Sequence, residues 1–279
     1  MANSAIETGH ANVVSHSEWI EARKEFLRKE KEFTRLRDEL SRQRRTLPWE
    51  KVEKRYRFDS TKGKTTLADL FEGRSQLVVY HFMFSPGWEQ GCPSCSFWAD
   101  HFDGTTVHLA NRDTTLAVIS RAPLGEIEAF KKRMGWKFQW VSSFGSDFNF
   151  DYHVSFTPEE ISSGKLEYNY APMEGFPSEE APGVSVFAKD AAGELFHSYS
   201  TYGRGIDILN GTYNLLDLVP KGRDEDGLAF TMSWVRHHDR YTEGYFVDPA
   251  QEAEDLFAGY EQAKSAGAKC CSGESRTDG

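Results

Sequence analysis

Residues 80–95 read YHFMFSPGWEQGCPSC and place two cysteines at the start of a predicted helix. The run 76–84 is apolar enough for a buried central strand, and a loop rich in turn-forming residues follows it. Cys92-Pro93-Ser94-Cys95 then opens a helix, because proline is tolerated in a first turn that has no N–H partner to lose. After a central strand of an α/β sheet, a C-x-x-C pair predicts a redox dithiol.

The chemistry of disulfide exchange suits this placement. The attacking species is a thiolate, and the free N–H groups at a helix start stabilise an anion on the first cysteine. The second cysteine lies one turn further on, close enough to close a disulfide. We therefore expect Cys92 to be the nucleophile and Cys95 the resolving thiol, with two inert thiols as the alternative.

Zinc is a second alternative, because His101 and His108 follow the cysteine pair. Six residues of helix, however, turn His101 about 240° away from Cys95, at ~100° per residue. The two histidines also lack the usual spacing of zinc ligands. We expect neither a metal nor another cofactor.

Strands and helices alternate on both sides of this motif. The patterns predict strands at 52–58, 76–84, 114–120, 137–142, 184–189 and 194–202, and helices beginning at 92 and spanning 124–134 and 206–218. This order predicts an α/β fold with a largely parallel sheet. The expected organisation is a leader (1–14), an amphipathic helix (15–48), a domain (49–245) with an insertion of little regular structure (143–181), a C-terminal helix (246–264) and a disordered tail (265–279).

The helix at 15–48 has a clear start. Ser15 and Glu18 form a capping-box pattern, and apolar residues then recur at helical spacing between densely charged faces. Such a helix can lie on the core of its own domain. It can also serve as a dimerisation arm, so a homodimer remains an alternative.

Composition narrows the function classes. The chain of 279 residues has a formal net charge of −10, which argues against general nucleic-acid binding. The N-terminus has no basic region followed by an apolar stretch, and no apolar run is long enough to span a bilayer, so we expect a cytoplasmic protein without membrane contact. Four cysteines are too few for a disulfide-built fold, and Cys270 and Cys271 in the tail are expected to be free thiols without function.

The order of elements resembles thioredoxin. The strand that precedes residues 65–73 and an extra strand near Trp140 resemble the peroxiredoxin branch. The resemblance implies a thioredoxin-like, peroxiredoxin-type central mixed sheet with flanking helices, to which this chain adds the long N-terminal helix. Pro182 matches the thioredoxin cis-proline, which implies a cis bond beside the dithiol and contact with the substrate backbone. Trp88 and Arg121 complete the expected substrate-binding residues; Arg121 would stabilise a thiolate or sulfenate, or form a structural ion pair.

A closer resemblance covers most of residues 15–245. It is carried by RRTLPW (44–49), HFMF (81–84), CPSCS (92–96), SRAP (120–123), FNFD (148–151) and WVRHHD (234–239). These stretches resemble a bacterial thioredoxin-like family that is catalogued as a domain of unknown function with a predicted dithiol–disulfide oxidoreductase role.

The resulting hypothesis is a thiol–disulfide oxidoreductase that acts on a thiol or disulfide substrate, protein or small molecule, with an unidentified reducing partner. The alternatives are a peroxiredoxin-like thiol peroxidase and a non-catalytic redox-sensing or binding module. Peroxiredoxins have Thr or Ser three residues before the reactive cysteine, whereas this chain has Glu89. Of the other histidines, His81 is expected to be hydrogen-bonded in the core, and His237 and His238 to lie on the surface.

Overall fold

The computed structural model describes residues 12–173, 178–228 and 230–241 and divides the chain into two compact units, 1–48 and 49–279. The first unit is the helix α1 (His16–Arg44). Its predicted capping box is confirmed, because the Ser15 side chain accepts from the N–H of Glu18 and the Glu18 carboxylate accepts from the N–H of Ser15. No helix among the described residues has the length and apolar character needed to cross a bilayer.

The second unit is built on an eight-stranded sheet with the order β1-β10-β9-β4-β5-β6-β2-β3. Its strands are β1 (Glu50–Lys51), β2 (Arg57–Ser60), β3 (Gly63–Thr66), β4 (Gln76–His81), β5 (Thr114–Ser120), β6 (Gln139–Ser142), β9 (Gly183–Lys189) and β10 (Leu195–Tyr202). Among the strands of the described residues, only β4, β5 and β6 are parallel neighbours, and the other pairs in this sheet are antiparallel. The sheet is therefore mixed, not largely parallel as the alternation of elements predicted.

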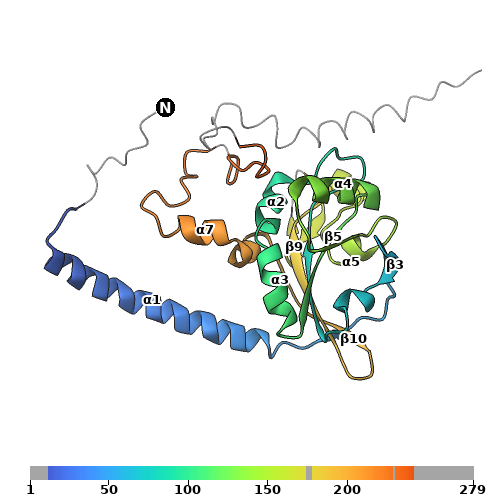
Figure 1. Ribbon diagram of the computed structural model, residues 1–279, viewed down its shortest axis with the longest axis horizontal. Helices are drawn as coiled ribbons and strands as arrows, with labels where there is room; N and C mark the ends of the chain where they lie inside the picture. The colour runs from blue at the N-terminus through green and yellow to red at the C-terminus, as the bar shows by residue number, and fades with distance from the viewer. Residues whose placement is uncertain (1–11, 174–177, 229, 242–279) are drawn as a thin grey trace, which may run out of the picture. The chain divides into compact units, whose positions relative to one another are not determined.

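Helices cover both faces of this sheet (Figure 1). The helices of this unit are η2 (Asp69–Phe71), α2 (Pro93–Ala99), α3 (Asp103–Ala110), α4 (Leu124–Met134), α5 (Phe148–Asp151), α6 (Pro158–Ser163), η3 (Gly203–Leu209) and α7 (Gly211–Leu216). Side chains alternate along β4, so Tyr80 packs with the cluster under α2 and α4, and Val79 packs with the cluster under η2 and α5. The predicted thioredoxin-like mixed sheet with flanking helices and a long N-terminal helix is confirmed by this strand order.

Three segments differ from their predictions. Residues 52–56 lie between β1 and β2 outside any strand, and the helix predicted at 206–218 is split into η3 and α7 at Asn210, whose side chain caps α7. The insertion 143–181 holds α5, α6 and a hairpin of β7 (Leu166–Tyr168) and β8 (Ala171–Met173), which is more regular structure than its composition predicted. The predicted C-terminal helix 246–264 and tail 265–279, with Cys270 and Cys271, lie outside the described residues.

Candidate functional site

The dithiol follows the loop that leaves β4. Cys92 is the N-cap residue of α2, Pro93 is its first helical residue, and both Cys92 and Cys95 are free thiols. The backbone of Met83 holds both cysteines: its carbonyl accepts from the Cys92 N–H at 3.1 Å, and its N–H donates to the Cys95 sulfur at 3.4 Å. One residue just beyond the end of β4 thus fixes the relative position of the two thiols.

The two thiols have opposite pKa shifts. The pKa of Cys92 is lowered, mainly by a hydrogen bond from the Cys95 thiol, and also by the N–H groups of Cys95 and Ser94 and the Ser94 side chain, against an opposing effect of burial. The pKa of Cys95 is raised well above its usual value by burial and by the neighbouring Cys92. Of the two thiols, Cys92 is therefore the one that ionises more readily.

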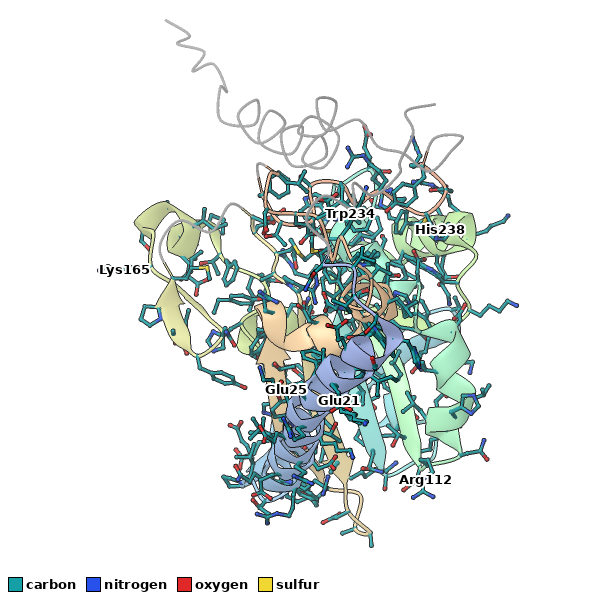
Figure 2. The ribbon with its side chains drawn as sticks, turned by 90° about the vertical axis from the view of Figure 1, so that its left-hand side faces the viewer. Glu21, Glu25, Arg112, Lys165, Trp234 and His238 are labelled. Atoms are coloured by element: carbon teal, nitrogen blue, oxygen red, sulfur yellow. The ribbon has the colours of Figure 1, made fainter. Side chains whose placement is uncertain are left out.

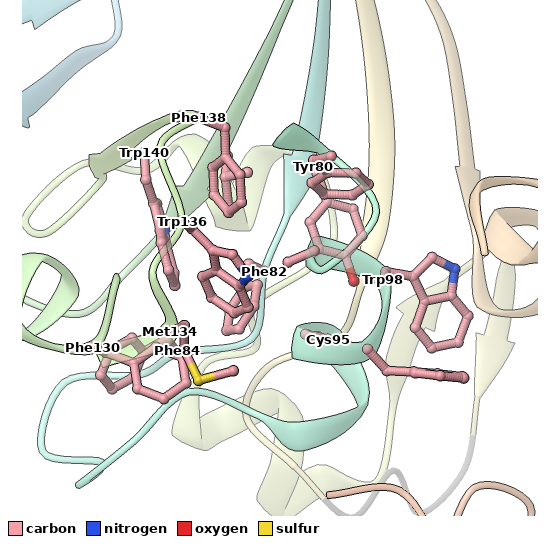
Figure 3. Packing of buried hydrophobic residues seen from close by; sticks show 14 of the residues in the cluster. Tyr80, Phe82, Phe84, Cys95, Trp98, Phe130, Met134, Trp136, Phe138 and Trp140 are labelled. Atoms are coloured by element: carbon pink, nitrogen blue, oxygen red, sulfur yellow. The ribbon is translucent and has the colours of Figure 1, made fainter. Parts of the chain in front are cut away.

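Tyr80 lies beneath the dithiol in β4. Its side chain is fully buried, and its hydroxyl points toward the helix that carries Cys95 (Figure 3). The hydroxyl lowers the pKa of Cys95, although it is not aligned for a full hydrogen bond with any atom of the described residues. The buried Tyr80 hydroxyl therefore acts on the Cys95 thiol.

Gly91 has no room for a side chain. A Cβ atom there would lie 2.6 Å from the Phe82 ring and 2.8 Å from the Phe130 ring. The Gly91 carbonyl accepts a hydrogen bond from Nε2 of His237 at 2.8 Å. The peptide unit joining Gly91 to Cys92 is thus held at both polar groups, by His237 on the carbonyl and by Met83 on the N–H.

His237 is itself held by Arg133. The Arg133 guanidinium donates to Nδ1 of His237 at 3.3 Å, to the Asp239 carboxylate at 2.8 Å and to Gln90 in the dithiol loop at 3.0 Å. Burial lowers the pKa of His237 to about 4, so the ring is neutral at neutral pH, and its proton is assigned to Nε2, which faces a carbonyl.

The predicted surface position is therefore wrong for His237, which is buried because Phe130 and the dithiol loop cover it. His238 is partly exposed, and its Nδ1 lies 2.7 Å from the Asp100 carboxylate. Figure 2 shows His238 and Trp234 at the same end of the domain. The prediction for His81 is confirmed, since it is buried and its Nε2 lies 2.8 Å from the Ser185 hydroxyl.

Pro182 immediately precedes β9, in which Gly183 pairs with His81, so it stands beside the start of the dithiol loop. The predicted cis bond is wrong, because no peptide bond among the described residues is cis. The preceding chain is already extended, with the Ala181 N–H bonded to Val154, and a trans bond carries it straight into β9. The Pro182 carbonyl accepts from the Tyr168 hydroxyl at 2.7 Å, and the raised pKa of Tyr168, due mainly to burial, has a contribution from Cys95.

Arg121 forms an ion pair with Glu180 at 2.8 Å and lies 4.6 Å from the centre of the Phe150 ring. Arg121 was expected either to stabilise a thiolate or sulfenate or to form a structural ion pair, and the structure shows the ion pair. Burial raises the pKa of Glu180 to about 7, although Arg121 acts to lower it. Trp88 is partly buried against the cluster that includes Cys92, and Glu89 is exposed.

The profile of a family described as a bacterial protein of unknown function, DUF899, matches residues 8–241. The chain belongs to the DUF899 family. None of the curated protein sequences compared with it matches.

Several solved structures resemble this DUF899 chain. A mutant of PrxQ from Xylella fastidiosa has 12% identity and a TM-score of 0.37, over 60% of this chain and 95% of that chain. Peroxidoxin BcpB from Mycobacterium tuberculosis has 14% identity and a TM-score of 0.35, again over 60% and 95%. A mutant of peroxiredoxin 6 from Arenicola marina has 16% identity and a TM-score of 0.37, over 58% and 70%. The fold assignment itself depends on the strand order described above.

In this DUF899 chain the structure brings together the two cysteines, and it places Trp88 in the loop before them and Pro182 beside the start of that loop. Arg121 is engaged by Glu180 instead of a thiol. Sequence reasoning missed Tyr80, Gly91 and Arg133. The alternation along β4 and into the residue that follows it puts Tyr80 and Phe82 on one face, and this was the signal that the sequence offered for Tyr80.

Proposed function

We propose that the protein is a cytoplasmic thiol–disulfide oxidoreductase in which Cys92 attacks and Cys95 resolves. The observation that carries the proposal is a pair of free thiols one helical turn apart that have opposite pKa shifts, lowered at Cys92 and raised at Cys95. Nucleophilic cysteines have this type of microenvironment, whereas buried structural cysteines do not.

The reaction needs no group beyond the two thiols and the substrate. The Cys92 thiolate attacks one sulfur of a substrate disulfide, forms a mixed disulfide and releases the other sulfur as a thiolate. Cys95 then gives up its proton and attacks the Cys92 sulfur, which forms the Cys92–Cys95 disulfide and releases the second substrate thiol. The substrate gains two electrons from the enzyme dithiol. One of its two protons comes from Cys95, and the other comes from the solvent, which received the Cys92 proton when that thiol ionised. The reverse sequence oxidises a dithiol substrate.

Pro182 and Trp88 are proposed to border the bound substrate. Pro182 presents backbone beside the loop that leaves β4, and Trp88 lies within that loop. Arg121 is proposed to act indirectly, because its ion pair holds Glu180, two residues before Pro182.

The test is reaction of the reduced protein with a small aromatic disulfide and, in parallel, with hydrogen peroxide. Fast consumption of the disulfide, with loss of two hydrogens in the peptide that contains Cys92 and Cys95, supports the oxidoreductase. Fast consumption of peroxide alone would instead favour a thiol peroxidase. Reaction with neither would leave a binding or sensing module and overturn the proposal.

The roles of the two cysteines are tested separately. Cys95→Ser should accumulate a mixed disulfide at Cys92, because attack survives and resolution is lost. Cys92→Ser should accumulate none and serves as the matched control. If the Cys92→Ser variant is the one that traps substrate, the assignment is reversed.

A further inference from the structure

The helix α1 carries a seven-residue repeat. Its four a positions are Trp19, Phe26, Phe33 and Leu40, one in each successive heptad. An apolar repeat of seven sustained over about three to four heptads is typical of a coiled coil. The helix has 29 residues and no break, which is enough length for all four heptads.

The a-position side chains are exposed. Trp19 is 53% exposed, Phe26 56%, Phe33 66% and Leu40 51%, and α1 contains no buried residue. The d positions, Ala22, Lys29, Leu36 and Gln43, are weaker, so the a positions provide most of the apolar seam. Exposed aromatic side chains repeated along one line of a helix are a surface that a partner helix would cover.

The charges beside this seam specify the partner. All four g positions are glutamates: Glu18, Glu25, Glu32 and Glu39. Three of the four e positions are arginines, namely Arg23, Arg37 and Arg44, and the fourth is Glu30. Arg23 forms an ion pair with Glu30 along the same helix at 2.7 Å, which neutralises the single acid in the e row.

These rows distinguish the two ways in which a pair of identical helices can align. In a parallel pair, each g residue faces the e residue five positions later in its partner. Three of the four contacts across the seam join opposite charges, Glu18–Arg23, Glu32–Arg37 and Glu39–Arg44, and the fourth, Glu25–Glu30, joins like charges. In an antiparallel pair, g faces g and e faces e, so glutamates would oppose glutamates and arginines would oppose arginines. Opposite charges stabilise the first alignment, and like charges disfavour the second.

We propose that α1 is the dimerisation element of this protein and forms a parallel two-stranded coiled coil with α1 of a second copy. The occupant of the apolar seam is the same helix, because that sequence supplies both the acidic row and the basic row. The proposal is independent of the redox chemistry of Cys92 and Cys95.

The experiment measures the mass of the full-length protein by light scattering over a wide range of concentration. The wild type should pass from monomer to dimer. Glu32→Arg and Arg37→Glu should each raise the dimer dissociation constant by about tenfold or more, since each reverses two symmetry-related pairs. The double variant Glu32→Arg/Arg37→Glu should return to within about threefold of the wild type. Matched controls are Asp38→Arg and Lys31→Glu, which make the same charge changes on the outer face at f positions.

The apolar seam is tested with Phe33→Gln, which should abolish the dimer, against Thr34→Gln at the neighbouring b position, which should keep it. Circular dichroism and the alkylation rate of Cys92 establish that each variant is folded. A wild type that stays monomeric at every concentration would overturn the proposal, because the stripe would then cover its own domain or a different protein. A dimer that Glu32→Arg tightens would overturn the parallel alignment.

Discussion

Nε2 of His237 donates a hydrogen bond to the carbonyl of Gly91 at 2.8 Å, across 146 residues of sequence. This contact ties the segment around His237 to the residue directly before Cys92. The N–H of the same peptide unit is bonded to the Met83 carbonyl, so the two hydrogen bonds together fix the orientation of the peptide plane between Gly91 and Cys92.

Replacement of His237 by leucine should loosen this peptide. The Gly91 carbonyl would remain buried without a donor, which costs about 1–3 kcal/mol of unfolding free energy. We also expect slower and less selective alkylation of Cys92, measured with iodoacetamide and peptide mass spectrometry. His237→Gln keeps an N–H donor and should recover part of both quantities. Unchanged stability and alkylation in His237→Leu would show that the contact has no positioning role.

The same residue predicts a pH effect. The folded-state pKa of His237 is about 4, below its ordinary 6.5, so its contribution to stability is present above pH 6.5 and is lost as the pH falls toward 4. Urea unfolding of the wild type and His237→Gln at pH 7 and pH 4.5 should show a larger loss for the wild type. Equal losses in the two proteins would contradict this sign.

Glu180 predicts the opposite sign. Its folded-state pKa of about 7 lies above its ordinary 4.5, so its contribution is present below pH 4.5 and is lost as the pH rises through 7. Between pH 5 and pH 8 this amounts to about 2 kcal/mol, which Glu180→Gln should remove from the pH dependence of the unfolding free energy. Glu126→Gln, at an exposed position of α4, is the control that should retain it. A slope that Glu180→Gln leaves intact would rule out this group as its source.

Gly91 should not tolerate alanine. The added methyl group would meet the Phe82 and Phe130 rings well inside contact distance, and overpacking of this kind costs about 1–3 kcal/mol. Gly104→Ala, in α3 with no atom within 4 Å of the new Cβ, should be neutral or slightly stabilising. Thermal unfolding of the two variants measures the difference, and similar melting temperatures would refute the prediction.

Tyr80→Phe should affect the second thiol more than the first. Loss of the hydroxyl beside Cys95 raises the pKa of that thiol further, so a smaller fraction of it is ionised at neutral pH and its attack on the mixed disulfide is slower. The mixed disulfide at Cys92 should therefore persist longer in stopped-flow traces, while alkylation of Cys92 stays near the wild-type rate. Tyr56→Phe removes a hydroxyl bonded to Asp151 on the other face of the sheet and should leave resolution unchanged.

Local signals decided most of the fold. The strand 114–120 and the helix 124–134 have the predicted bounds, because a continuous apolar run sets the first, and Pro123 and Gly135 bracket the second. The strand predicted at 52–58 failed because its alternation has another cause: the Val52 N–H pairs with Leu195 just beyond β1, and Tyr56 is buried by its contact with Phe148. The position of the cysteine pair at the start of a helix could be predicted, because C-x-x-C is a local motif.

The residues that surround the dithiol could not be predicted from local patterns in the sequence. The contacts of Gly91 with His237 and of Arg121 with Glu180 join residues that are 146 and 59 positions apart. Neither periodicity nor turn chemistry specifies such pairs. The extended chain before Pro182 likewise depends on a hydrogen bond from Ala181 to Val154, and the sequence around Val154 has no periodicity that predicts this contact.

The distance in sequence between Gly91 and His237 also sets an order of events during synthesis. At about 5–20 residues per second, His237 is polymerised about 7–30 s after Gly91. Throughout that interval the cysteine pair already exists, whereas the residue that restrains the loop from its C-terminal side does not. A nascent chain therefore carries its dithiol in a loop held from one side only, and the geometry of the mature pair is acquired when the last part of the domain is made.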